Sequence, residues 1–126
     1  MQPIPEPRFT ISEHDWPTLH WDLFLEVEAV LWSWRLLADP RASTVIPVER
    51  TTDHRKLYLD YEGPVSDNRG TVRIIETGRF RPTSKFFDQF ELKGKSLSGL
   101  WRFACIEGSE CLIREGNVKS GELRDS

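Results

Sequence analysis

The sequence predicts a single antiparallel β-barrel with little helix. Short segments in which apolar and polar residues alternate recur along the chain, a pattern typical of strands with one buried face. Glycine, proline, aspartate and asparagine separate these segments at regular spacing, which indicates a closed or nearly closed barrel. With 126 residues, the chain is long enough for one domain with a core and too short for two.

The barrel is expected between two ends of different character. Residues 1–8 contain three prolines, which lack an amide donor and fix φ, so we expect an extended N-terminal arm and not an interior strand. Residues 116–126 are polar and contain glycine, which predicts a loose tail. The barrel domain is therefore assigned to residues 9–115.

The first strand is expected to be short. Phe9 and Ile11 alternate with polar neighbours, and we expect this strand to run into a loop that contains His14. Pro17 then prevents a helix and pushes Trp16 toward extended geometry.

Residues 19–37 are rich in aromatic and branched residues and contain neither glycine nor proline. The first half alternates between an apolar face, made of Trp21, Leu23, Leu25 and Val27, and a second face made of His20, Asp22, Phe24 and Glu26. The second half also alternates, so a hairpin that turns near Glu28 and Ala29 is favoured, although neither residue is typical of a turn. A long amphipathic helix is the alternative.

Further strands are predicted at 44–48, 57–61, 71–76, 101–106 and 111–114, and an aromatic segment runs from Phe86 to Leu92. Gly63-Pro64 is expected to end the second of these strands and Gly78 the third. Cys105 and Cys111 have the wrong number and spacing for a zinc knuckle or a disulfide framework, which favours buried free thiols.

Composition excludes several functional classes. The chain is 38% hydrophobic and 29% charged, and it contains neither an apolar run long enough for a bilayer nor a signal-peptide pattern, so a cytoplasmic protein without a membrane partner is expected. The net charge of -3 argues against broad, sequence-independent coating of nucleic acid. A local basic patch remains compatible with it, because arginines gather between residues 41 and 81.

Two of the three histidines and two carboxylates fall within the nine residues from His14 to Asp22. In an extended strand, His20 and Asp22 project from the same face. Imidazole nitrogen and carboxylate oxygen suit a divalent ion such as Mn²⁺ or Zn²⁺, and His14 could supply a third ligand from the preceding loop. For any one of these residues, packing or capping is the plainer interpretation.

These residues open an ordered series of motifs: His14-Asp15, Leu19-His20-Trp21-Asp22, Glu26, Ser33-Trp34, Asp53-His54, Tyr58, Asp60, Glu62-Gly63, Gly70-Thr71-Val72 and Leu97-Ser98-Gly99-Leu100-Trp101. In this order, over roughly residues 9 to 106, the chain resembles the 3′-phosphoesterase domain of bacterial DNA ligase D. The resemblance implies a β-barrel that trims 3′-phosphates and terminal ribonucleotides from DNA ends with manganese during end joining. It also implies that His14, His20 and Asp22 hold the metal, while His54 and Tyr58 face the scissile phosphate.

The chain departs from the family at four positions. The family has an arginine where this chain has Phe24, a lysine and an arginine that contact phosphate at the positions of Ala38 and Ile46, and a glutamine at Ser12. Loss of cationic groups weakens stabilisation of a transferring phosphoryl group. Arg50, Arg55 or Arg69 could substitute from neighbouring positions.

The favoured function is that of a stand-alone, metal-dependent phosphoesterase that acts on DNA 3′ ends. Its expected catalytic residues are His14, His20, Asp22 and His54. A ligase or polymerase of end joining is a possible partner. The alternative is an inactive barrel that binds nucleic acid or protein in a repair complex, which Phe24 would favour by drying the cleft. A barrel for a small apolar ligand would explain five tryptophans but not the histidines. Trp16 is the one tryptophan expected to offer a stacking surface for a base.

Overall fold

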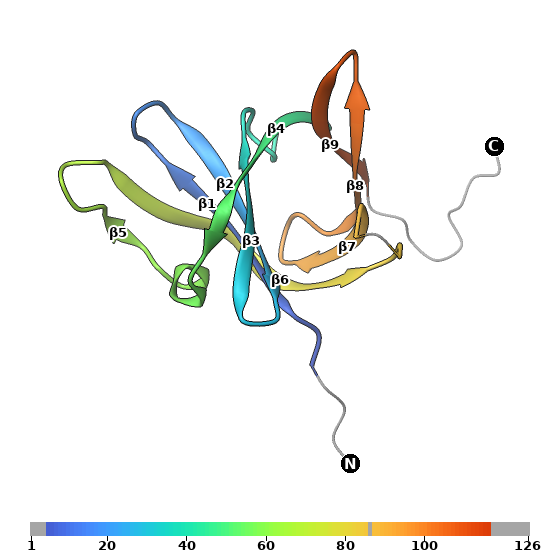
Figure 1. The fold of residues 1–126 in the computed structure, drawn as a ribbon, viewed down its shortest axis with the longest axis horizontal. Coiled ribbons are helices and arrows are strands. Elements are labelled where there is room, and N and C mark those ends of the chain that lie inside the picture. Colours follow the sequence, from blue (N-terminus) through green and yellow to red (C-terminus); the bar gives the residue numbers. More distant parts are fainter. Residues whose placement is uncertain (1–4, 86, 117–126) are drawn as a thin grey trace.

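The computed structural model describes residues 5–85 and 87–116, in which eight antiparallel strands close into a barrel (Figure 1). Around the barrel the order is β1-β2-β3-β4-β9-β8-β7-β6, and pairing of β6 with β1 closes it, while the short β5 lies on the other side of β6. The strands are β1 (Arg8–His14), β2 (His20–Val27), β3 (Val30–Leu36), β4 (Val45–His54), β5 (Gly63–Pro64), β6 (Thr71–Pro82), β7 (Gln89–Gly94), β8 (Gly99–Ile106) and β9 (Ser109–Gly116). The predicted barrel with little helix is confirmed.

The ends of the chain lie largely outside this description. Of the expected arm, residues 1–4 are not among the described residues, and neither are 117–126 of the expected tail. Glu6 in the described part of the arm accepts hydrogen bonds from the side chains of Lys93 and Arg79. None of the described residues belongs to a helix long and apolar enough to cross a membrane.

The hairpin predicted within residues 19–37 is confirmed, and the helix alternative is excluded. β2 and β3 pair from Trp21 opposite Leu36 to Val27 opposite Val30. The chain reverses at Glu28, whose φ of 57° lies in the left-handed region that a tight turn requires. The period of two therefore reflects two adjacent strands.

Alternate residues of the strands fill the barrel. Cross-strand pairs such as Ile11 with Leu23 place both side chains on the same, inner face. The fully buried core residues are Phe9, Ile11, Leu23, Leu25, Leu36, Ile46, Phe80, Phe90, Leu92, Trp101 and Leu112. Trp21 and Trp34 are also buried with this core, whereas Trp16 is 42% exposed.

The strand predicted at 57–61 is wrong. Lys56–Leu59 form a short 3₁₀ helix, η1, and only Gly63–Pro64 pair with β6. The physical reason is tertiary: Leu59 is buried against Phe24 and Leu31 on the outer face of the barrel, so the chain packs one apolar side chain there instead of adding a strand. The strand preference of the alternating pattern is weaker than the stabilisation gained by burying Leu59.

Several predicted boundaries are also wrong. β4 continues through Pro47 to His54, because proline needs only its carbonyl there, which accepts a bond of 2.9 Å from the Leu37 amide. Gly78 does not end β6 but lets it pass close to β7, since a side chain at this position would overlap the Lys93 carbonyl. Cys105 is exposed, while Cys111 is buried as predicted.

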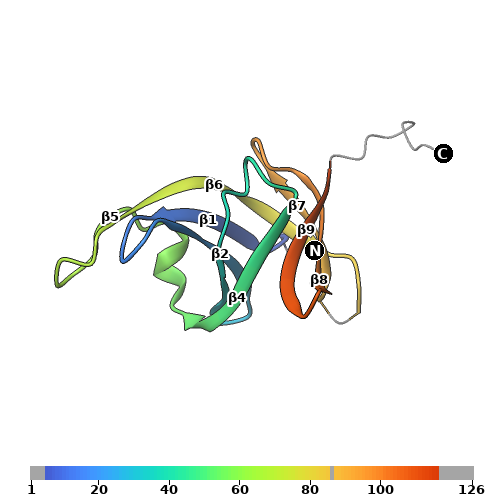
Figure 2. The same ribbon diagram turned by 90° about the horizontal axis from the view of Figure 1, so that it is seen from above.

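The segment between β4 and β6 covers the outer face of the barrel at one end. η1 contacts β1 and β2, and the hydroxyl of Thr10 donates to the Leu59 carbonyl at 2.8 Å. In Figures 1 and 2 the green 3₁₀ helix lies beside these strands, and the turn between β5 and β6 projects from the same end. Outward side chains of β1 and β2 are therefore partly enclosed here.

Candidate metal centre

His14, His20 and Asp22 converge on the outer face of the barrel. His14 ends β1 and pairs directly with His20 at the start of β2, while Asp22 pairs with Ser12. Directly opposed residues of antiparallel strands share a face, so the register brings the three side chains together. One donor atom from each lies within 4.8 Å of the others. The expectation that His14 reaches in from a loop is wrong, because His14 belongs to β1.

Backbone carbonyls orient both imidazoles. The His20 Nδ1 lies 2.9 Å from the Thr18 carbonyl, and the His14 Nε2 lies 2.8 Å from the Arg69 carbonyl. Since a carbonyl oxygen only accepts, each of these nitrogens carries the hydrogen. The His20 Nε2 and the His14 Nδ1 are thereby left with lone pairs. Carbonyls in this role are common around metal-binding histidines.

The turn that carries Arg69 reaches His14 because of a glycine. Gly70 has a φ of 81°, and a side chain on it would overlap Asp15 and Trp16. This close approach lets the Asp15 carboxylate accept a hydrogen bond of 2.7 Å from the Thr71 amide. The β5–β6 turn is therefore tied to the β1–β2 loop beside the three converging residues.

The electrostatics of the trio favour a cation. The His20 Nε2 lies 3.5 Å from a carboxylate oxygen of Asp22, and His20 is almost completely buried. The Asp22 carboxylate raises the pKa of His20, and burial opposes this by lowering it. A proton and a metal ion compete for the same lone pair.

A pocket of about 220 Å³ opens over the trio. His14 and Asp22 lie in its wall, together with Ser12, Phe24, His54, Tyr58, Val65, Arg69 and Val72. His54 from β4 and Tyr58 from η1, which sequence reasoning placed at the phosphate, thus open onto the same space as His14 and Asp22. Val65 carried no signal in the sequence, because nothing marks an isolated valine as a pocket residue, whereas Val72 belongs to the Gly70-Thr71-Val72 motif.

Phe24 occupies the middle of this wall. Its ring centroid lies 5.1 Å from that of His54 and 6.4 Å from that of Tyr58. Phe24 is only 5% exposed and packs with Leu31 and Leu59, so it contributes an apolar part of the wall that Asp22 and His54 also line. The expectation that Phe24 shares a face with the metal-site residues is confirmed by the pocket lining.

Ser12 contributes a buried hydroxyl that is unsatisfied. Its side chain is 1% exposed, and its Oγ has no hydrogen-bond partner among the described residues. Thr10, two residues earlier on the same strand, satisfies its hydroxyl with the Leu59 carbonyl. Buried polar groups without partners are rare and costly, so the Ser12 hydroxyl is available to a bound ligand. Two imidazoles, a carboxylate and a free hydroxyl fit a divalent ion with a bound oxyanion.

Of the three arginines considered as substitutes, only Arg69 lines the pocket. Its Nε and Nη2 donate to the Ser66 carbonyl and hydroxyl at 2.8 and 3.1 Å. Arg50 lies over the ring of Trp34, 4.7 Å from its centroid. Ile46 is buried in the barrel core and Ala38 packs against that core, so neither lies in the pocket wall.

Comparison with known proteins identifies the family to which a chain with this site belongs. The family model described as "DNA Ligase D 3'-phosphoesterase domain" matches residues 12–104. The chain is also 28% identical, over an alignment of length 131, to the multifunctional non-homologous end joining protein LigD of Pseudomonas aeruginosa. That alignment covers 93% of this chain but only 16% of the Pseudomonas protein. Because the family match spans most of the chain and includes every residue of the pocket wall, the chain belongs to the DNA ligase D 3′-phosphoesterase domain family.

Proposed function

We propose that this chain is a metal-dependent phosphoesterase that removes a phosphate or a terminal ribonucleotide from DNA 3′ ends before they are joined. The observation that carries the proposal is the convergence of His14, His20 and Asp22 beside a pocket that His14 and Asp22 line together with His54. Family membership supports this chemistry, since the matching domain is described as a 3′-phosphoesterase.

His14, His20 and Asp22 would hold the ion, for which manganese is proposed. Such an ion would polarise a phosphoryl oxygen and lower the pKa of a bound water molecule. The carbonyls of Thr18 and Arg69 keep the two imidazoles in the tautomers that binding needs.

His54 would act on the phosphate or the leaving group. Its Nδ1 lies 2.9 Å from the Thr52 carbonyl, so the Nδ1 carries the hydrogen and the Nε2 is the free ring nitrogen. When protonated, this Nε2 donates either to a phosphate oxygen or to the departing oxygen as a general acid. Tyr58, whose ring centroid is 5.5 Å from that of His54, would supply a hydroxyl beside it.

Arg69 and Ser12 would replace part of the missing phosphate contacts. Arg69 is exposed and lies at the mouth of the pocket, where its charge favours an anion. The free hydroxyl of Ser12 would donate to a phosphate oxygen. Arg69 and Ser12 would stabilise the charge on the phosphoryl group less than the three cationic residues that the family has at positions 24, 38 and 46. We therefore expect slow turnover.

A second candidate, an inactive binding module, is favoured by Phe24. Its ring lines the pocket beside His54, at the position where the family is expected to have an arginine. Such a module would hold a DNA end for a ligase or polymerase partner without changing it.

The two candidates are separated by measuring phosphate release from a 3′-phosphorylated primer–template, together with metal analysis of the purified protein. We expect slow release that requires manganese and stops with a chelator. Stoichiometric metal and DNA binding without any release would instead establish the binding module.

A further inference from the structure

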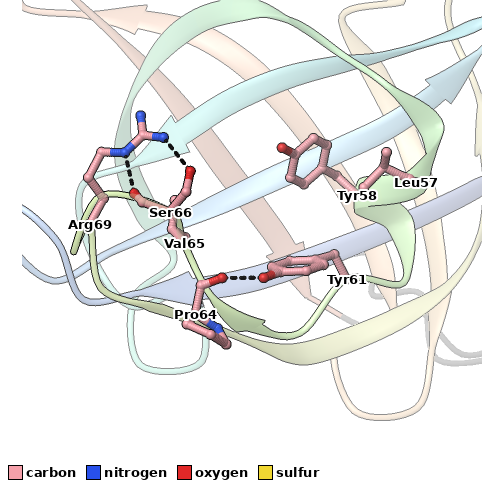
Figure 3. A pocket seen from close by; sticks show the side chains of 7 residues that line it. All are labelled: Leu57, Tyr58, Tyr61, Pro64, Val65, Ser66 and Arg69. Carbon is pink, nitrogen blue, oxygen red and sulfur yellow. Dashed lines mark hydrogen bonds between the residues drawn. The ribbon is translucent and has the colours of Figure 1, made fainter.

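A second, larger pocket of about 390 Å³ opens beside the first (Figure 3). One wall comes from η1 and the residues after it, with Leu57, Tyr58 and Tyr61. The opposite wall comes from the β5–β6 turn, with Val65 and Ser66 next to Arg69. Its volume lies within the range of sites for small molecules.

The two pockets are adjacent and share part of their walls. Tyr58, Val65 and Arg69 line both of them. A ligand whose phosphate lies near His54 would therefore place its neighbouring atoms against Tyr58 and enter the second pocket. This arrangement suits a phosphate that carries a bulky organic group on one side.

The walls suit a flat, aromatic group. The rings of Tyr58 and Tyr61 lie 6.0 Å apart at 69°, so they meet edge to face and do not stack on each other. The Tyr61 hydroxyl donates to the Pro64 carbonyl, which fixes this ring across the floor of the pocket (Figure 3). Leu57, 48% exposed, adds apolar surface at the open side. Base–aromatic stacking uses surfaces of this kind.

Polar groups lie on the opposite rim. The Ser66 hydroxyl accepts from Arg69, so its own hydrogen remains available to a ligand. A heteroaromatic base offers ring nitrogens and carbonyl oxygens that accept such hydrogen bonds. The pocket thus combines apolar faces with donors at one edge.

We infer that this second pocket binds the base of the nucleotide at the DNA 3′ end, while its phosphate lies in the first pocket. The inference rests on the proposed function and names the group that positions its substrate. Stacking on an aromatic wall would add binding energy to the phosphate contact whatever the identity of the base. A base can enter only when it is unpaired, so single-stranded or frayed ends are preferred.

The test compares two 5′-fluorescein single-stranded oligonucleotides that carry a 3′-phosphate and differ only in the last residue, thymidine or an abasic tetrahydrofuran. Binding is measured by fluorescence anisotropy in a chelator, so that no turnover occurs. The wild type should bind the abasic end roughly 5- to 150-fold more weakly, the factor that corresponds to one lost base–aromatic stack. Equal affinity for the two ends, or binding of neither, would overturn the inference.

Three variants locate the effect. Tyr61→Ala should lose most of the preference for the base, and the exposed Leu57→Ala should reduce it without affecting folding. Ile106→Ala, exposed at the distant end of β8, should keep it. Retention of the preference in both pocket variants would show that the base binds elsewhere.

The same oligonucleotides separate this inference from the proposed function when manganese is added. Phosphate release without base preference would retain the phosphoesterase and reject the base pocket. Base preference without phosphate release would retain the base pocket and reject the phosphoesterase.

Discussion

The two faces of β1 and β2 use the same backbone for opposite purposes. On the inner face, residues such as Ile11 and Leu23 are fully buried within the hydrophobic core. On the outer face, Ser12, His20 and Asp22 are buried or half-buried although they are polar. The inner face is complete without a ligand, whereas the outer face has unused lone pairs and an unpaired hydroxyl. Incomplete polar satisfaction thus distinguishes the candidate site from the scaffold in the same strands.

The largest effect should come from removing an outer ligand. His20→Ala is expected to abolish manganese-dependent phosphate release and to weaken metal binding strongly, because two donors remain where three converge. Calorimetric titration with manganese and the phosphate-release assay measure both losses. Asp22→Asn, which nearly preserves volume, should behave alike; full activity in either variant would mean that the ion binds elsewhere.

A matched change on the inner face should affect stability and leave the chemistry intact. Leu23→Ala leaves a cavity in the core and should lower the free energy of unfolding by about 2–5 kcal/mol. Urea denaturation measures this loss. The remaining folded protein should bind manganese like the wild type, and a specific loss of metal affinity would show that the two faces are not independent.

Phe24→Arg should raise the rate of phosphate release, because it adds a phosphate-binding group to the outer face. The new guanidinium would share the face of Asp22 and add a cationic contact, worth ~3 kcal/mol or ~10²-fold in rate. Rates of 3′-phosphate release before and after the change measure it, with Phe24→Leu as the control for lost ring volume. If arginine raises the rate no more than leucine, charge is not what the pocket lacks. Robust turnover by the wild type would mean that another arginine already supplies this contact.

Glu76 is a buried carboxylate that lies outside the candidate site and whose hydrogen bonds are complete. Its carboxylate accepts hydrogen bonds from the amides of Thr77, Lys95, Ser96 and Leu97. Burial raises the pKa of Glu76, but these four amides together outweigh it and hold the pKa below the usual 4.5. Every oxygen is satisfied, in contrast to the hydroxyl of Ser12.

Glu76→Gln should therefore destabilise the protein by about 1–3 kcal/mol at neutral pH. A lowered folded-state pKa stabilises above the unfolded pKa near 4.5, and this contribution disappears as the pH falls through the folded value. The difference between wild type and variant should shrink in acid. Denaturation curves at pH 7 and below pH 4 measure it, and a constant difference would show that the charge is not responsible.

The smallest effect is expected at Ser12. Ser12→Ala removes a buried hydroxyl that has no partner among the described residues, so the free protein should become more stable by ~1 kcal/mol. Phosphate release should nevertheless fall several-fold, because the hydroxyl would donate to the bound phosphate. Thermal melting should show the gain in stability, and the release assay should show the loss of activity. Thr10→Ser, which keeps a satisfied hydroxyl on the same strand, is the control.

The alternation of residues 20–27 determined a great deal by itself. It predicted the strand, the hairpin with β3 and the common face of His20, Asp22 and Phe24, because side chains in a strand alternate regardless of their neighbours. The spacing of motifs along the chain likewise indicated the family that the comparison shows. These features depend on local geometry or on order in the chain, which a sequence displays directly.

Only the tertiary structure decided what surrounds that face. The register of β1 against β2 placed His14 opposite His20, and the contact of Leu59 with the outer face turned an alternating segment into η1. Carbonyls of Thr18 and Arg69, distant in sequence from one another, orient the two imidazoles. Backbone carbonyls exist at every residue, and burial of one leucine depends on a surface built by other strands. Such features follow from which segments meet in space, and the sequence does not display them.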